Sequence, residues 1–187
     1  MSSNTIDRIS PAPAPAHVGQ ATAIEQSRAV AEVQAAVVVA QQRPRNIEAA
    51  KIEMRLSCTR QRLAEKAFYA FPRAGETVSG ASVYLARELA RVWGNIQYGI
   101  HELRRNDAEG YSEMQAWAWD LQTTTRTAST FVVPHKRDTK KGVKLLTDLR
   151  DVYENNANAG ARRVRECIFA VLPPWFTAEA EELCNST

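Results

Sequence analysis

Residues 96–133 read IQYGIHELRRNDAEGYSEMQAWAWDLQTTTRTASTFVV, and this stretch decides the predicted fold. It holds three runs rich in β-branched and aromatic residues, a composition typical of strands. Turn-forming residues separate the runs at 106–110 and again at 123–125. We therefore expect a three-stranded antiparallel meander. A sheet this small needs a helix on one face to be stable.

The sequence after the meander supplies such a helix. A long helix is predicted from Thr147, which caps it, to about Leu172, because Pro173 and Pro174 end it. At 100° per residue, its apolar face consists of Leu149, Tyr153, Val164, Cys167 and Val171. A polar stripe beside that face consists of Asn155, Asn158, Arg162 and Arg165. The predicted fold class is α+β, with the meander packed on this helix as a β-β-β-α core.

Three additional helices are predicted upstream. The first covers residues 20–42, is rich in Ala and Val, and is interpreted as a contact between subunits. The second begins after Asn46 and runs to about Ala70. Its expected apolar face consists of Ile52, Leu56, Leu63, Ala67 and Ala70. A loop at 72–80 then leads to a third helix, which Ser79 or Ser82 caps and Gly94 ends.

The chain has 187 residues and a net charge of +3, but its charge is unevenly distributed. Residues 126–165 contain ten Lys or Arg and four acids, whereas residues 166–187 contain four acids and no Lys or Arg. Such a basic block indicates a polyanionic partner. The predicted organisation is a flexible Pro/Ala-rich arm at 1–18, a main folded domain at 19–172 and a short acidic helix or tail at 173–187.

The common catalytic motifs are absent from the sequence. It contains no phosphate-binding loop, dinucleotide fingerprint, HExxH, CxxC or GxSxG motif, so we expect no enzymatic activity. Cys58, Cys167 and Cys184 are interpreted as reduced thiols, and His17, His101 and His135 as isolated residues. No apolar run approaches the ~20 residues that span a bilayer, and we expect a cytoplasmic protein.

Two segments resemble a known family. SVYLARELARVWGN at 82–95 and RDVYENNANAGARRVREC at 150–167, together with the meander between them, resemble phage single-strand annealing proteins of the RecT/Redβ/Erf type. The resemblance implies an ATP-independent protein of homologous recombination that binds single-stranded DNA and pairs complementary strands. It also implies a ring or helical filament of identical subunits that retains the annealed duplex. A phage exonuclease and a host single-strand-binding protein are implied partners, with no cofactor except Mg²⁺ as a modulator of DNA binding.

The resemblance, together with the positive charge, assigns the DNA contacts. The long helix contributes Arg162, Arg163 and Arg165, with Asn155 and Asn158 beside them. The basic loop at 135–144 contributes Lys136, Arg137, Lys140, Lys141 and Lys144. Further candidates are Arg87 and Arg91, before the first strand, and Arg104 and Arg105, at its end. Arg suits phosphate because its planar guanidinium offers several donors in a fixed fork.

Other interpretations stay open at this stage. The meander and helices could form a protein–protein adaptor whose basic residues are ordinary surface. A metal-dependent nuclease would use Glu109, Glu113 and Asp120. Trp117 and Trp119 share one face of a strand, so they either cover the helix or face a ligand together.

Overall fold

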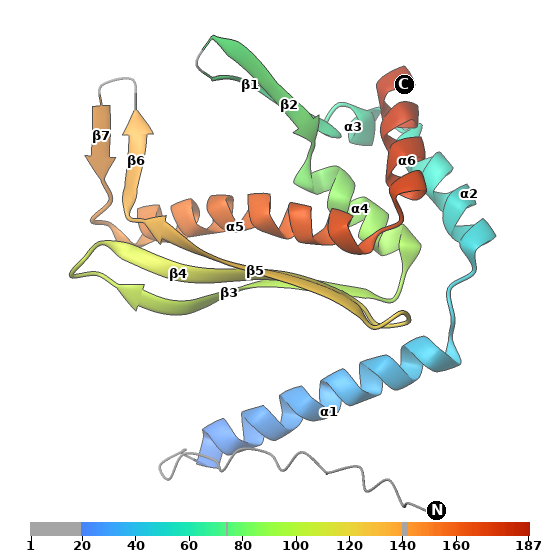
Figure 1. Ribbon diagram of the computed structural model, residues 1–187, viewed down its shortest axis with the longest axis horizontal. Coiled ribbons are helices and arrows are strands. Elements are labelled where there is room, and N and C mark those ends of the chain that lie inside the picture. Colours follow the sequence, from blue (N-terminus) through green and yellow to red (C-terminus); the bar gives the residue numbers. More distant parts are fainter. Residues whose placement is uncertain (1–19, 74, 140–141) are drawn as a thin grey trace, which may run out of the picture. The chain divides into compact units, whose positions relative to one another are not determined.

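The computed structural model describes residues 20–73, 75–139 and 142–187 (Figure 1). The predicted arm at 1–18 and the candidate contacts Lys140 and Lys141 lie outside these residues. The chain divides into two units, Met1–Val39 and Ala40–Thr187. The first holds most of helix α1 (Gln20–Gln42), which confirms the predicted helix there. No helix in the described part of the chain has the length and hydrophobicity needed to cross a bilayer.

The second unit has an α+β fold. Its main sheet is antiparallel, in the order β3 (Ile96–Asn106), β4 (Tyr111–Asp120), β5 (Thr125–Pro134), and helix α5 (Leu149–Val171) packs on it. Strand alternation sets the buried face, because every second residue of β4 from Ser112 to Asp120 is buried. The structure thus confirms the predicted meander and the long helix that covers it.

Small residues allow α5 to approach the sheet closely. Ala116 and Ala118 of β4 are fully buried against it, and Cys167 Sγ donates a 3.6 Å hydrogen bond to the Ala116 carbonyl oxygen. A Cβ atom on Gly160 would lie 2.8 Å from Ile100 Cδ1 and 3.0 Å from its Cγ2. Any larger residue at position 160 therefore forces the Ile100 side chain to shift or the helix and strand β3 to move apart.

The sheet-facing side of α5 differs from the prediction at its N-terminal end. Leu149 and Tyr153 are 59% and 58% exposed, while Val152 and Asn156 are buried. The helix begins after Asp148, whose carboxylate accepts hydrogen bonds from the backbone N–H groups of Arg150 and Asp151, and not after Thr147. The prediction of the buried face failed because Asn156 and Gly160 are on the side of α5 that contacts the sheet, and neither is a typical apolar core residue.

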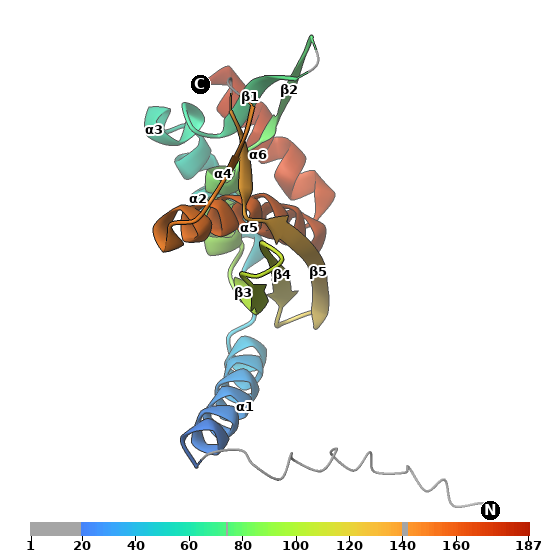
Figure 2. The same ribbon diagram turned by 90° about the vertical axis from the view of Figure 1, so that its left-hand side faces the viewer.

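Helices α2 (Ile47–Cys58), α4 (Val83–Trp93) and α6 (Pro174–Ser186) lie on the same side of the sheet as α5 (Figure 2). Their fully buried core residues include Met54, Cys58, Leu85, Leu89 and Phe176. The Ser82 side chain caps α4 by accepting hydrogen bonds from two backbone N–H groups, and Gly94 follows its last turn at φ 74°, as predicted. The acidic C-terminal helix begins at Pro174, directly after the proline that ends α5.

The prediction of the second helix is wrong beyond Cys58. Helix α2 ends there, the short α3 (Gln61–Ala64) follows, and β1 (Phe68–Arg73) pairs with β2 (Glu76–Ala81) in an antiparallel hairpin. Ile52 and Leu56, expected in the core, are exposed, because α2 turns Met54 and Cys58 inward instead. The basic loop is also a hairpin, formed by β6 (Lys136–Thr139) and β7 (Gly142–Leu145).

A buried ion pair fastens the segment before α2 to the far end of the sheet. Arg45 Nη2 lies 2.8 Å from Asp120 Oδ1, with side chains only 7% and 2% exposed. The same guanidinium donates to the Gly94 carbonyl oxygen and stacks over the Trp93 ring at 4.6 Å. Burial alone raises the pKa of Asp120, but hydrogen bonds from Arg45 and from two backbone N–H groups outweigh it, so this pKa lies below its usual value.

Gly160→Val should destabilise the fold by about 2 kcal/mol, because the new side chain overlaps Ile100 in a packed interface. Ala157→Val is the matched control, since Ala157 is exposed on the same helix and its replacement costs only about 0.7 kcal/mol of helix propensity. Urea unfolding measures both. Equal losses for the two variants would contradict the close helix–sheet contact.

Arg45→Met should cost about 3–5 kcal/mol at pH 7, because it leaves the Asp120 carboxylate buried without its partner. A carboxyl group whose pKa is lowered by folding contributes stability at high pH and loses it as the pH falls through that pKa. The difference in unfolding free energy between wild type and variant should therefore narrow below about pH 4. A pH-independent difference would contradict this role for Arg45.

Candidate nucleic-acid interface

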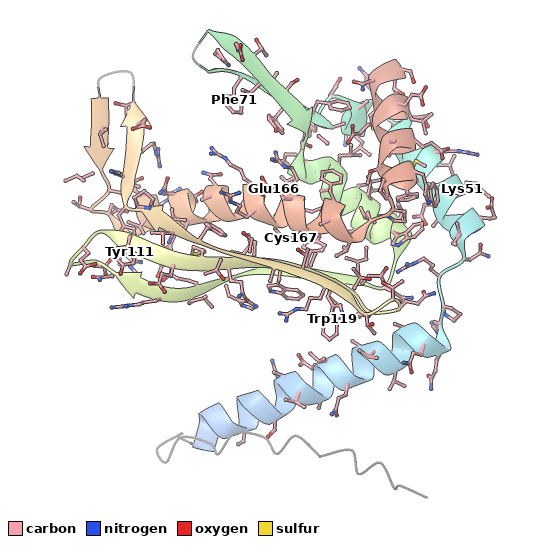
Figure 3. All side chains as sticks on the ribbon, in the orientation of Figure 1. Lys51, Phe71, Tyr111, Trp119, Glu166 and Cys167 are labelled. Carbon is pink, nitrogen blue, oxygen red and sulfur yellow. The ribbon has the colours of Figure 1, made fainter. Side chains whose placement is uncertain are left out.

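The side of α5 that faces away from the sheet carries the three arginines that were predicted on the long helix. Asn158, Arg162 and Arg163 are exposed, while Asn155 and Arg165 are half-buried. Figure 3 shows Glu166 on this outward side and Cys167 on the side toward the sheet. Since the inward side is fixed by packing, the outward direction of these polar residues is fixed with it.

Three adjoining cavities run along this side and together form what we call the α5 groove. The central one, of about 410 Å³, is lined by Lys136, Asn155, Arg162, Arg163 and Arg165, with Phe131 and Glu166 among its other residues. A second, of about 900 Å³, shares Asn155 and Arg162 with it and adds Arg137, Arg150, Asp151, Glu154 and Asn158. A third, of about 460 Å³, shares Arg162 and Arg165 and adds Tyr69, Phe71 and Tyr84. Arg162 lines all three.

Two of the three arginines are held in place by neighbours. Arg165 lies over the Tyr69 ring at 4.6 Å, and its side chain is 17% exposed. Arg163 pairs with Glu166 at 3.1 Å and lies 5.8 Å from the Phe131 ring centre. Among the described residues, no hydrogen bond, ion pair or ring contact holds Arg162. Its guanidinium therefore offers donors to a ligand in the groove.

The charge of the groove is positive. Six Lys or Arg and three acids line the three cavities. Lys144, on β7, lies beside the groove and pairs with Asp151 at 3.8 Å, which offsets one of these acids. The hairpin β6–β7 thus brings Lys136, Arg137 and Lys144 to the N-terminal half of α5. These residues of the basic segment therefore lie next to the helix, and their contact with DNA stays a prediction.

A buried polar network anchors that hairpin. A 2.9 Å hydrogen bond joins Ser112 Oγ and His135 Nε2, and Asn156 Nδ2 donates to both Ser112 Oγ and Glu102 Oε2 at 3.0 Å. Asn155 adds a hydrogen bond to the Pro134 carbonyl oxygen. The interpretation of His135 as isolated was therefore wrong, because its partners come from distant segments of the chain.

This network is unsuited to nucleophilic chemistry. His135 Nδ1 lies 3.7 Å from Asp107 Oδ1, so serine, histidine and aspartate follow one another as in hydrolase triads. The Ser112 side chain, however, is fully buried, and its oxygen already accepts a hydrogen bond from Asn156.

The buried Cys58, elsewhere in the core, is also a poor nucleophile. Burial and the neighbouring Cys184 raise the pKa of the Cys58 thiol to about 12, which disfavours the reactive thiolate.

Four predicted contacts lie outside the α5 groove. Arg91 pairs with Glu88 and with Glu53, each at 2.8 Å. Its hydrogen bonds to these two carboxylates raise the pKa of Arg91, and the hydrogen bond from Arg91 lowers the pKa of Glu88. Arg105 pairs with Asp107 at 2.7 Å and lies over the Tyr153 ring. Exposed Arg87 and Arg104 line none of the three cavities.

The carboxylates of the nuclease interpretation do not come together. Glu113 and Asp120 lie seven residues apart on β4, which is roughly 24 Å along a strand. Their side chains also point to opposite faces of the sheet, and Asp120 is engaged by Arg45. These residues cannot share one metal ion.

Sequence reasoning missed the aromatic end of the groove. Tyr69 and Phe71 lie in β1, where a helix end and a loop were predicted, and their rings stack at 5.9 Å. The alternating aromatic residues of FYAFPR at 68–73 were a strand signal that could have identified them. Arg150 was also missed, because it precedes the polar stripe on the helix.

Comparison of the chain with protein-family models, with curated proteins and with solved structures gives no match. We therefore derive the function from the geometry and charge of the groove. The functional proposal below depends on the arrangement of Arg162, its flanking cations and the aromatic residues of β1.

Val164→Ala should destabilise the protein by about 1–3 kcal/mol, because Val164 is 1% exposed beneath the groove. The double variant Arg162→Ala/Arg165→Ala should cost less than about 1 kcal/mol, the value of the Arg165–Tyr69 contact at a partly exposed site. Chemical denaturation compares the two. A larger loss in the double variant would mean that these arginines support the fold instead of facing a ligand.

Proposed function

We propose that this protein binds single-stranded DNA in the α5 groove and anneals complementary strands without ATP. In this proposal the arginines and Lys136 hold successive phosphates, and the bases stay available for pairing. Base pairing then supplies the sequence specificity, so the protein needs to grip only the backbone and support the bases.

The observation that carries the proposal is the continuity of the groove. Arg162 lies where the three cavities meet, with Lys136 and Arg137 on one side and Arg165 on the other. An elongated polyanion can contact all of them at once, whereas a compact ligand would use only one cavity. Release of counterions from each phosphate would favour binding.

The aromatic end of the groove favours a single strand over a duplex. Phe71 is 45% exposed and Tyr84 57% exposed, and both line the third cavity beside Arg162 and Arg165. Unpaired bases stack on aromatic rings and on guanidinium planes, a contact that paired bases inside a helix do not offer.

The resemblance to the RecT/Redβ/Erf annealing proteins supports the same proposal. The meander precedes the long helix in the chain, as the β-β-β-α core of that family requires, with hairpin β6–β7 inserted between them. Assembly of identical subunits on DNA, the phage exonuclease and host single-strand-binding protein, and modulation by Mg²⁺ belong to the same proposal. For assembly, α1 offers the exposed apolar residues Ile24, Val30 and Val39.

Wild-type protein should bind a fluorescent oligonucleotide with an affinity that falls as salt increases, with a slope of about −0.7 per phosphate contacted. Arg162→Ala/Arg165→Ala should weaken binding and make that slope shallower by about 1.4, because two phosphate contacts are lost. Fluorescence anisotropy at several salt concentrations measures both.

Arg60→Ala/Arg62→Ala is the matched control. Both residues are exposed and line none of the cavities of the groove, so this variant removes the same charge elsewhere on the surface. An equal change in the two double variants would show that only net charge matters and would refute the groove.

A further inference from the structure

The main sheet has a second face, opposite α5, which we call the outer sheet face. Strand alternation and register place on it one residue in two from each strand. These residues include Gln97, Gly99, His101, Arg104, Glu113, Gln115, Trp117, Trp119, Arg126 and Thr130. Figure 3 shows Trp119 on this side of the sheet, away from α5. The alternative that the two tryptophans cover the helix is therefore excluded.

Trp117 lies flat on the sheet. A Cβ atom on its cross-strand neighbour Gly99 would lie 3.0 Å from three atoms of the indole, Cε2, Cζ2 and Nε1. The indole therefore covers the glycine, and the half-buried Trp117 has its Nε1 buried without a hydrogen-bond partner among the described residues. The exposed His101 ring lies beside it, with centroids 5.9 Å apart and only 13° between the planes. The two nearly parallel rings together form an aromatic surface.

Trp119 extends this surface along β4. It lies two residues from Trp117, which is about 6.8 Å along a strand, roughly twice the ~3.4 Å rise per base in a stacked strand. The exposed Arg126 of β5 is the cross-strand neighbour of Trp119, and the Arg126 guanidinium lies 5.9 Å from the centre of the Trp119 indole. This spacing allows Trp117 and Trp119 to contact two separate bases.

The surroundings of the tryptophans suit nucleobases better than an apolar protein segment. Gln97, Gln115 and Thr130 place amide and hydroxyl groups around the rings, where they can hydrogen-bond to base edges. Arg104 and Arg126 outnumber Glu113 among the charged side chains named for this face, so the charge also favours a polyanion. Flat sheets with aromatic residues on adjacent strands are a known platform for unpaired bases.

We propose that the outer sheet face is a second binding site for single-stranded DNA, which holds the bases by stacking on Trp117, His101 and Trp119. The choice of ligand rests on the proposed function, but the site is separate from the α5 groove because it lies on the other side of the sheet. Stacking contributes most of its binding, so its affinity depends less on salt than that of the groove. One subunit would thus hold strands on two sides.

The test is photo-crosslinking of full-length protein to an oligonucleotide that contains 5-iodouracil, with the attachment sites mapped by mass spectrometry. We expect adducts on Trp117, Trp119 or His101, and we expect them to persist in Arg162→Ala/Arg165→Ala. Trp117→Leu/Trp119→Leu in that background should weaken the remaining binding ~10-fold or more, the change expected when base stacking is lost. Trp175→Leu, which removes a 46% exposed tryptophan from α6, is the matched control.

The outcomes separate this site from the groove. If wild-type protein binds the oligonucleotide but all adducts map to groove residues such as Tyr69, the outer site is refuted and the proposed function stands. If the wild type does not bind at all, both proposals fail. If the leucine variant changes self-association in sedimentation experiments but not the binding that remains, the face contacts another subunit and the proposal is overturned. Mapping adducts on wild-type protein keeps the test decisive even if the leucine variant does not fold.

Discussion

The close contact between α5 and the sheet is the constraint on which the rest of the structure depends. Gly160 lies against Ile100, and Ala116 and Ala118 of β4 are fully buried, so the helix turns its small-residue side to the sheet. Once that inward side is fixed, helix geometry turns Asn158 and Arg162 outward. The same sheet leaves Trp117 and Trp119 on its other face, because side chains alternate along β4. The two surfaces proposed for DNA are thus consequences of one packing contact.

Hairpins complete the groove at its two ends. The buried hydrogen bonds among Ser112, His135 and Asn156 fix the base of β6–β7, which carries Lys136 and Arg137. At the other end, Tyr69 of β1 supports the guanidinium of Arg165. These hydrogen bonds favour one arrangement of the surrounding elements, although Asn156 Oδ1 is buried without a hydrogen-bond partner among the described residues. Preorganised cations lose less entropy when they bind a ligand.

Local patterns in the sequence predicted the meander, helix α4 with Ser82 as one of two candidate caps, and the long helix with its cluster of arginines. Sequence reasoning missed both hairpins. It overlooked the aromatic strand signal of β1, and strands β6 and β7 are only four residues long and exposed throughout, so they show no buried face. It also assigned Arg91 to DNA, although Glu53, 38 residues away, occupies that guanidinium in the folded protein. Contacts between distant segments decide which cations are free, and a single sequence does not display them. Arg162, Arg163 and Arg165 were predictable because one helix carries all three.

Strand annealing itself gives the most direct test of the proposed function. Two complementary oligonucleotides that carry a donor and an acceptor fluorophore are mixed with the protein in the absence of any nucleotide, and energy transfer reports their pairing. We expect wild-type protein to accelerate pairing well beyond the spontaneous rate, and Arg162→Ala/Arg165→Ala to remove most of that acceleration. Pairing at the spontaneous rate with wild-type protein, or unchanged acceleration by the double variant, would contradict annealing in the α5 groove.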